Sequence, residues 1–214
     1  MRKKYISEEI GNDITKWRSG KIIIQAQTGR GKSTFILEEA IPYWLKEGKK
    51  VLILVNRNSL RKQYIYQQAL SQDTYETGVK IKTYQEFAGE IRKEGKLVDA
   101  FHNYNVVVLD EVHFFISDSD FNPADTYIVW QAILHSCAQC MVFMSATLEE
   151  LQPFLEEYVK RIEKLESCRD GMKRFWLYST ETDYAYVKPE ILPDLESLIS
   201  LIAESEKKTI VFFG

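Results

Sequence analysis

Short apolar runs alternate along this chain with longer segments in which apolar residues recur at helical spacing. The apolar runs lie near residues 21–26, 51–56, 79–83, 105–110 and 140–145, and the helical patterns lie near 32–47, 58–71, 84–94, 123–136 and 148–166. An unbroken run such as Val106–Leu109 is typical of a strand that is covered on both faces. Because strands and helices alternate, right-handed crossovers are expected. The pattern predicts an α/β fold, a parallel β-sheet flanked by helices on both faces.

The first 20 residues mix charged side chains with a few apolar ones. Ile10, Ile14 and Trp17 are spaced by four and three residues, so a short helix can place all three against the core. Gly20 is a residue type that ends such helices. We therefore expect an N-terminal helical segment at residues 1–20.

The pattern changes after about residue 167. A further strand is expected at 175–178, a helix at 195–204 and a last strand at 208–214. This last strand either completes the first sheet or opens a second unit. We expect one lobe at residues 21–180, followed at 181–214 by a connection and the start of a truncated second lobe.

A glycine-containing loop follows the first predicted strand. Residues 26–33 read Ala-Gln-Thr-Gly-Arg-Gly-Lys-Ser, which departs from the pattern G-x-x-x-x-G-K-[ST] only at Ala26. Gly29 and Gly31 allow the backbone to curl so that successive N–H groups point at phosphate oxygens. Lys32 supplies a positive charge for the β- and γ-phosphates, and Ser33 offers a hydroxyl to Mg²⁺. The loop predicts a nucleoside triphosphate site.

Two adjacent carboxylates follow the predicted strand near 105–110. Asp110 and Glu111 emerge at its carboxyl end, the edge of an open α/β sheet at which ligands bind. Asp110 can therefore reach the Mg²⁺ shell, and Glu111 can polarise a water for in-line attack on the γ-phosphate. A solvated acidic pair is the simpler alternative, and the phosphate loop earlier in the chain argues against it.

Composition narrows the class of protein. The 214 residues are 45% hydrophobic, enough for one substantial core, and the chain has three cysteines and no stretch that resembles a signal peptide. The apolar runs are too short to span a bilayer, so we expect a soluble, cytoplasmic protein. The net charge of −3 means that nucleic-acid binding needs a local basic surface. Candidate residues for such a surface are Arg57, Arg61, Lys62, Lys80 and Lys82.

Several short runs occur in a fixed order along the chain. They cover residues 26–34, 54–60, 82–87, 110–113, 145–147 and 209–214. In this order they resemble motifs I, Ia, Ib, II, III and IV of the first RecA-like lobe of superfamily 2 helicases, the DEAD/DEAH-box type. The likeness extends from about residue 20 to the end of the chain. It implies a P-loop NTPase lobe of a helicase or translocase that hydrolyses ATP.

The resemblance also assigns roles to single residues. It implies ATP binding by Gln27, Thr28, Gly29, Arg30, Gly31, Lys32, Ser33 and Thr34. It implies Mg²⁺ binding by Ser33 and Asp110, and catalysis by Lys32, Asp110, Glu111 and His113. His113 would relay the nucleotide state to Ser145 and Thr147, and Arg57 and Thr83 would touch the backbone of a single strand of DNA or RNA.

The sequence contains no counterpart of motifs V and VI, which in this family belong to a second RecA-like lobe. That lobe contributes an arginine finger, whose effect on the rate is about 10³–10⁵-fold in related phosphoryl-transfer enzymes. We therefore expect the 214-residue chain to bind nucleotide, to hydrolyse it poorly and to unwind nothing alone. The alternative is a nucleotide-dependent regulatory module without unwinding activity. A P-loop kinase is disfavoured because Glu111 directly follows Asp110 and no lid of arginines is evident.

Two further groups of residues have alternative interpretations. His135, Cys137, Cys140 and Cys168 are ligand types that zinc takes, but their spacing is incomplete, and buried thiols are favoured. The aromatic residues Phe175, Trp176, Tyr178, Tyr184 and Tyr186 could stack on bases, although alternate aromatic positions in a strand more often pack a core.

Overall fold

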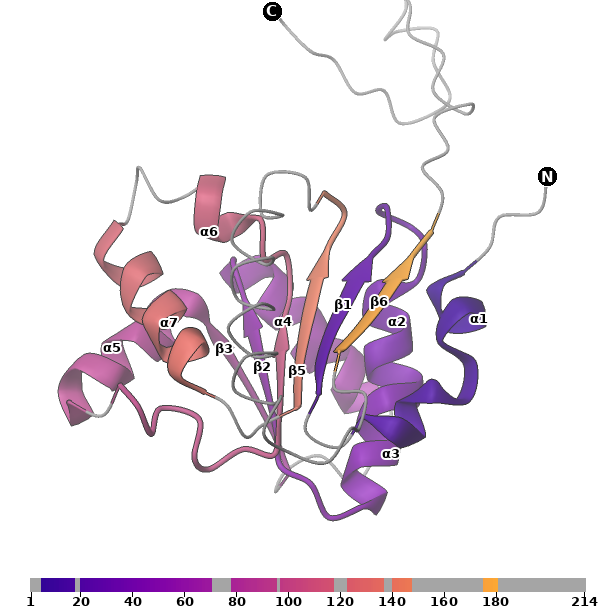
Figure 1. Cartoon of the computed structure of the whole chain (residues 1–214), viewed down its shortest axis with the longest axis horizontal. Helices are drawn as coiled ribbons and strands as arrows, with labels where there is room; N and C mark the ends of the chain where they lie inside the picture. Colours follow the sequence, from indigo (N-terminus) through magenta and orange to yellow (C-terminus); the bar gives the residue numbers. More distant parts are fainter. Residues whose placement is uncertain are drawn as a thin grey trace, which may run out of the picture. The chain divides into compact units, whose positions relative to one another are not determined.

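The computed structural model describes residues 5–17, 20–70, 78–95, 97–117, 123–136, 140–147 and 175–180, all within the first of two compact units, Met1–Glu181. The described strands are β1 (Lys21–Gln25), β2 (Val51–Val55), β3 (Val79–Thr83), β4 (Val106–Leu109), β5 (Cys140–Ser145) and β6 (Phe175–Ser179). They form one parallel sheet in the order β3-β2-β4-β5-β1-β6 (Figure 1). The strands predicted up to residue 178 and their parallel arrangement are confirmed.

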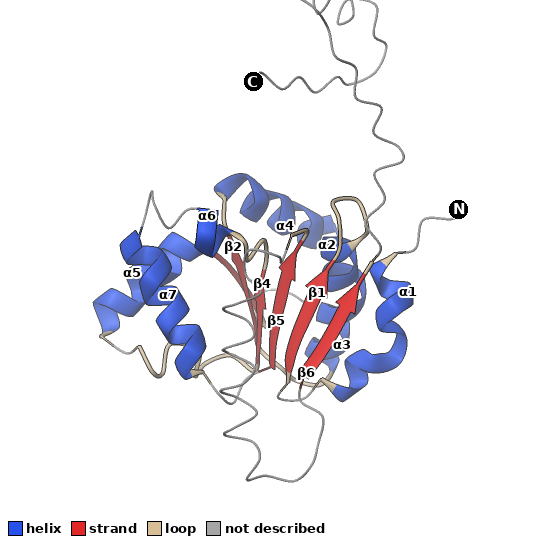
Figure 2. Ribbon diagram, turned by 45° about the horizontal axis from the view of Figure 1, so that its top comes forward, coloured by secondary structure: helices blue, strands red, loops and turns tan. Residues whose placement is uncertain are grey.

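Helices cover both faces of this sheet, as expected (Figure 2). The described α-helices are α1 (Ile6–Ile10), α2 (Lys32–Phe35), α3 (Ile41–Lys46), α4 (Asn58–Leu70), α5 (Tyr84–Glu94), α6 (Phe114–Ser117) and α7 (Pro123–His135). Residues of α1 to α4 pack on one face and residues of α5 to α7 on the other. Side chains alternate along each strand, so Ile22 and Ile24 face the first layer and Ile23 faces the second.

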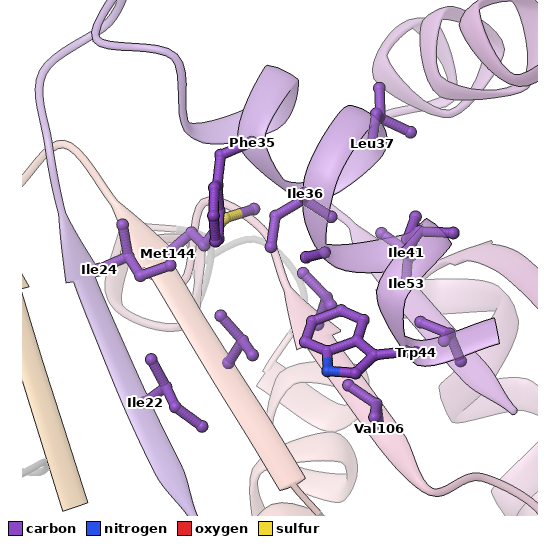
Figure 3. Packing of buried hydrophobic residues seen from close by; sticks show 14 of the residues in the cluster. Ile22, Ile24, Phe35, Ile36, Leu37, Ile41, Trp44, Ile53, Val106 and Met144 are labelled. Atoms are coloured by element: carbon purple, nitrogen blue, oxygen red, sulfur yellow. The ribbon is translucent and has the colours of Figure 1, made fainter. Parts of the chain in front are cut away.

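The helical segment that follows β1 packs on the face of the sheet covered by α1 to α4. Trp44 and Ile36 are fully buried against sheet residues such as Ile53 and Val106 (Figure 3). The predicted helix near 32–47 is interrupted at Ile36–Ala40 by a π-helical turn between α2 and α3. Removing a fully buried tryptophan side chain typically costs about 3–5 kcal/mol. The loop between β1 and α2 therefore starts and ends on well-packed elements.

The N-terminal segment differs from the expected single helix. Helix α1 ends at Gly11, whose φ of 49° breaks the α-helical path, and a 3₁₀ helix follows at Gly11–Lys16. Ile10 and Trp17 are buried, and Ile14 is partly buried and packs against the same core, so all three residues contact the core as expected. Ile6, one turn before Ile10, is buried there as well. A single helix does not carry them, because Gly11, at a positive φ, redirects the chain.

The remaining expectations concern residues outside the described part of the chain. They are the helices near 148–166 and 195–204 and the strand near 208–214. The division into segments 1–20, 21–180 and 181–214 stays a prediction. In the part of the chain that the structure describes, no helix is long and apolar enough to cross a membrane.

The strand order determines which loops meet. Ile23 of β1 and Leu109 of β4 both pair with Phe143 of β5, so one strand separates β1 from β4. Neighbouring strands lie about 4.8 Å apart, which places the carboxyl ends of β1 and β4 about 10 Å from each other. The loop after β1, the acidic pair after β4 and the end of β5 therefore meet at one edge of the sheet.

Candidate nucleotide-binding site

The loop after β1 has the curled backbone that its sequence predicts. Gly29 and Gly31 have φ values of 80° and 81°, in the region that only glycine adopts without strain. The N–H of Arg30 donates to the carbonyl of Gln27 at 3.1 Å, and the N–H of Phe35 donates to Gly31 at 2.8 Å. The loop therefore closes on itself and passes directly into α2, with the backbone form of an anion-binding nest.

Lys32 begins α2 and points back into this loop. Its Nζ donates to the carbonyl of Ala26 at 2.5 Å, and the residue is buried. Burial lowers the pKa of Lys32, while the nearby charges of Glu111 and Asp110 raise it. An anion inside the loop would compensate the buried ammonium, as the phosphate-binding prediction requires.

Asp110 lies at the end of β4, where its side chain is buried and held on both oxygens. Its Oδ2 accepts from the hydroxyl of Tyr64 at 2.8 Å, and its Oδ1 accepts from the N–H of Glu111 at 3.0 Å. Burial raises the pKa of Asp110 to about 6, the charge of Glu111 adds to the rise, and Tyr64 and Lys32 oppose it. Burial therefore disfavours the ionised form of Asp110 more than its hydrogen bonds and Lys32 favour it.

Glu111 has the opposite electrostatic character although it is the next residue. Its Oε2 lies 3.2 Å from Nδ1 of His113, and this interaction is the main reason why the pKa of Glu111 is lowered. Its backbone has φ of 53°, the one non-glycine residue with positive φ among those described. Such strain typically costs about 1–3 kcal/mol and is often found at functional sites. Adjacent carboxyl groups whose pKa values are pushed apart are a common feature of acid–base sites.

The end of β5 contacts the residues that follow this acidic pair. Nδ1 of His113 lies 3.1 Å from Oγ of Ser145. The Ser145 hydroxyl donates to the carbonyl of Thr147 at 2.6 Å and accepts from the N–H of Thr147 at 3.2 Å. The residues that the resemblance groups as nucleotide sensors, His113, Ser145 and Thr147, therefore form one hydrogen-bonded chain.

The donor set suits a nucleotide phosphate with Mg²⁺. Asp110 accepts from the hydroxyl of Tyr64, and Ser33 partly offsets the rise that burial causes in the pKa of that same hydroxyl, so both proposed ligands lie near Tyr64. Hydroxyl and carboxylate oxygens are the ligands that Mg²⁺ takes, and in such sites the phosphates and water supply the remainder. Among the described residues, no group of three or more His, Cys, Asp or Glu could hold a metal by itself.

The predicted nucleic-acid contacts lie on neighbouring strands. Arg57 follows β2 and is exposed, whereas Thr83 ends β3 and is buried. The Thr83 hydroxyl accepts from the N–H of Glu86, and the Glu86 carboxylate accepts from the N–H of Thr83, which forms a capping box on α5. Arg61 pairs with Glu86 at 2.8 Å and Lys82 pairs with Glu90, so part of the candidate basic surface is neutralised. Contact with nucleic acid stays a prediction for Arg57 and Thr83.

Two tyrosines at the site have no local sequence signal. Tyr64 on α4 and Tyr84 on α5 are both buried and both donate to Asp110, at 2.8 Å to the side chain and at 2.9 Å to the backbone carbonyl. Their partners lie 46 and 26 residues away in sequence, so only the assembled fold brings them together.

Of the other two candidate groups, Cys140, Trp176 and Tyr178 are buried, whereas His135 is exposed and its Nδ1 lies 2.7 Å from the carbonyl oxygen of Gln131. Cys140 is a buried free thiol with a pKa raised to about 12 by burial, as the favoured interpretation predicts. Cys137 and Cys168 lie outside the described residues. Trp176 and Tyr178 are buried, and the ring of Tyr178 packs against Trp17 in a tilted arrangement, with 5.7 Å between ring centroids. Tyr184 and Tyr186 lie outside the described part.

Comparison with known proteins adds to this geometry. The family model "Type III restriction enzyme, res subunit" (ResIII) matches residues 3–150, and none of the curated proteins matches the sequence. Among solved structures, the chain is similar to the crystal structure of the Pyrococcus furiosus Hef helicase domain, with a TM-score of 0.54 and 18% identity. That match covers 86% of this chain and 41% of the other, so the chain spans less than half of that structure, and the likeness shows the fold alone. By the family match, the chain belongs to the ResIII family, and it carries the first RecA-like lobe of a superfamily 2 helicase.

Proposed function

We propose that this lobe binds ATP with Mg²⁺ and, completed by a second RecA-like lobe, hydrolyses ATP to move along a single strand of nucleic acid. The observation that carries the proposal is the meeting of a curled phosphate loop and a polarised acidic pair across one strand of a parallel sheet. The run Asp-Glu-Val-His at residues 110–113 supports the DEAD/DEAH-box type within the superfamily.

The phosphate loop supplies the binding energy in this proposal. The N–H groups around Gly29 and Gly31 and the charge of Lys32 would hold the β- and γ-phosphates. Ser33 and Asp110 would hold Mg²⁺, which when bound supplies positive charge to the phosphate oxygens. Burial raises the pKa of Asp110 and so disfavours its ionised form. The hydrogen bonds from Tyr64 and from the N–H of Glu111 hold its two carboxylate oxygens in the orientation in which they would bind Mg²⁺.

Glu111 is the group proposed to take the proton from the attacking water. Its lowered pKa keeps it ionised at neutral pH, and the contact with His113 fixes its direction. The strained backbone at Glu111 turns the side chain away from the line of β4, so that Asp110 and Glu111 can serve different partners. His113 can then report the state of Glu111 to Ser145.

Arg57 and Thr83 are the proposed contacts to the sugar-phosphate backbone. Val55 pairs with Thr83 in the sheet, so the two strands end side by side and both residues lie at the same edge as the nucleotide site. Contacts of this kind hold a strand without reading its sequence. We propose that the segments divide as 1–20, 21–180 and 181–214 and that the second lobe provides the missing transition-state arginine.

Calorimetric titration of Mg²⁺-ATP tests the proposal. The parent chain is expected to bind, and Lys32→Ala is expected to lose at least about tenfold in affinity because the buried ammonium no longer meets the phosphates. Lys46→Ala, which removes an exposed lysine of α3, is the control and keeps the parent affinity. Equal Mg²⁺-ATP affinities of Lys32→Ala and Lys46→Ala would contradict the proposal that the loop containing Lys32 binds phosphate. In a protein that carries both lobes, hydrolysis that single-stranded oligonucleotide fails to stimulate would favour a regulatory module.

A further inference from the structure

A tyrosine outside the known motifs lies near the two residues assigned to the cation site. Tyr64 lies on α4, is 1% exposed and donates its hydroxyl proton to Oδ2 of Asp110 at 2.8 Å. Burial raises the pKa of Tyr64, and the side chain of Ser33 lies close enough to the same hydroxyl to lower it in part.

This arrangement holds the Asp110 carboxylate in one orientation. With Oδ2 held by Tyr64 and Oδ1 held by the N–H of Glu111, the Asp110 carboxylate cannot rotate freely. Carboxylates that bind a metal are normally held by such outer hydrogen bonds, whose loss typically weakens metal binding by about 10–100-fold.

We propose that Tyr64 is a positioning residue for the divalent cation, orienting the Asp110 carboxylate toward a cation that enters with the nucleotide. The inference rests on the proposed function, because it concerns the same site. It assigns to α4 a role in the cation site. That helix begins one residue after Arg57, so the proposed nucleic-acid contact and the cation site are joined by two helical turns.

Tyr84 offers a matched control for this role. It is also fully buried and also donates to Asp110, at 2.9 Å, but its partner is the backbone carbonyl and not the carboxylate. It stacks on Phe114 with 5.3 Å between ring centroids, so its ring has a structural role of its own. Tyr84→Phe and Tyr64→Phe each remove one hydroxyl that donates to Asp110. Only Tyr64→Phe removes a hydrogen bond to the carboxylate, the proposed cation ligand.

The experiment measures cation and nucleotide binding separately. Fluorescence of N-methylanthraniloyl-ATP gives the nucleotide affinity in EDTA and the Mg²⁺ concentration for half-maximal effect, and Mn²⁺ electron paramagnetic resonance gives the cation affinity directly. Tyr64→Phe is expected to raise the half-maximal cation concentration by about 10–100-fold and to leave the EDTA affinity within about twofold, since the phosphate contacts do not involve this hydroxyl. Tyr84→Phe is expected to change neither value.

Each outcome decides the proposal. An equal shift in both variants, no shift in either, or tighter cation binding by Tyr64→Phe overturns it. If Tyr64→Phe does not fold, ¹³Cζ-tyrosine spectra of the parent replace it: the Tyr64 signal must move when Mg²⁺ is added to the nucleotide complex, and a fixed signal overturns the proposal. A parent chain that binds no nucleotide is a failure of the proposed function, and it is recognised before any variant is compared.

Discussion

Removing the charge of Asp110 is expected to stabilise the protein increasingly as pH rises from about 4 to about 6, and to have little effect below about pH 4. Burial raises the pKa of Asp110 to about 6 from the ordinary value of 3.8. Because the folded state then binds the proton more tightly than the unfolded state, the free energy of unfolding falls as pH rises from about 4 through about 6. The difference between the two pKa values corresponds to about 3 kcal/mol at neutral pH.

Asp110→Asn removes this dependence on pH. Asparagine has the same shape, and the Tyr64 hydroxyl can turn to suit the amide. The variant is expected to exceed the parent in free energy of unfolding by up to about 3 kcal/mol at pH 8, and by much less at pH 4.5. For a chain of this size the gain corresponds to a rise in Tm of roughly 10 °C or less. Urea unfolding followed by circular dichroism from pH 4.5 to 8, in EDTA, measures the difference.

Glu111→Gln is the matched comparison because the shift at that residue has the opposite sign. The pKa of Glu111 is lowered, mainly by His113, so its ionised form stabilises the folded state above the ordinary pKa and this contribution is lost in acid. Glu111→Gln is therefore expected to be less stable than the parent at pH 8 and to approach it as pH falls. Two stability differences that stay constant with pH, or that change with the same sign, would refute the electrostatic description of the acidic pair.

Two further predictions concern the loop and the N-terminal segment. Gly29→Ala and Gly48→Ala place a Cβ on residues with φ values of 80° and 69°, and each Cβ has open space around it. Both variants are therefore expected to lose about 1–2 kcal/mol of stability in thermal unfolding because of backbone strain. Only Gly29→Ala is expected to lose nucleotide binding. Equal nucleotide binding by the two variants would contradict the role of Gly29. Tyr178→Phe removes a hydroxyl that donates to Asp13 at 3.0 Å and accepts from Trp17 at 3.3 Å. The free energy of unfolding in urea is expected to fall by about 1 kcal/mol. An unchanged free energy of unfolding would show that solvent replaces both contacts.

The strands and the phosphate loop could be predicted because their signals are local. An unbroken apolar run such as Val106–Leu109 indicates a strand covered on both faces, and the strand agrees with the prediction to within a residue at each end. Gly29 and Gly31 likewise indicate left-handed backbone without any knowledge of the rest of the chain. The strand order has no such local signal, because it depends on which distant strands pair.

Other features of the site depend on contacts that are distant in sequence. Leu60 and Tyr64 are four residues apart on α4, so the helical pattern indicates that Tyr64 faces the core but not that its hydroxyl meets Asp110. The break at Gly11 was missed because a single glycine is compatible with both a helix and its end. The positive φ of Glu111 has no signal in residue type, since glutamate seldom adopts that region.

The position of β5 explains how three separate runs can act as one site. The N–H of Ala26, at the start of the phosphate loop, donates to the carbonyl of Ser145 at 3.1 Å, and the N–H of Val112 donates to Met144 at 3.0 Å. The end of β5 is therefore bonded on one side to the residues that would hold the phosphates and on the other to the acidic run. Because Ser145 also contacts His113, a change in the direction of Glu111 on loss of the γ-phosphate can reach Ser145 through a single side chain. A strand on the edge of the sheet has only one neighbour and could not join the two runs, whereas β5 lies between β4 and β1 and contacts both.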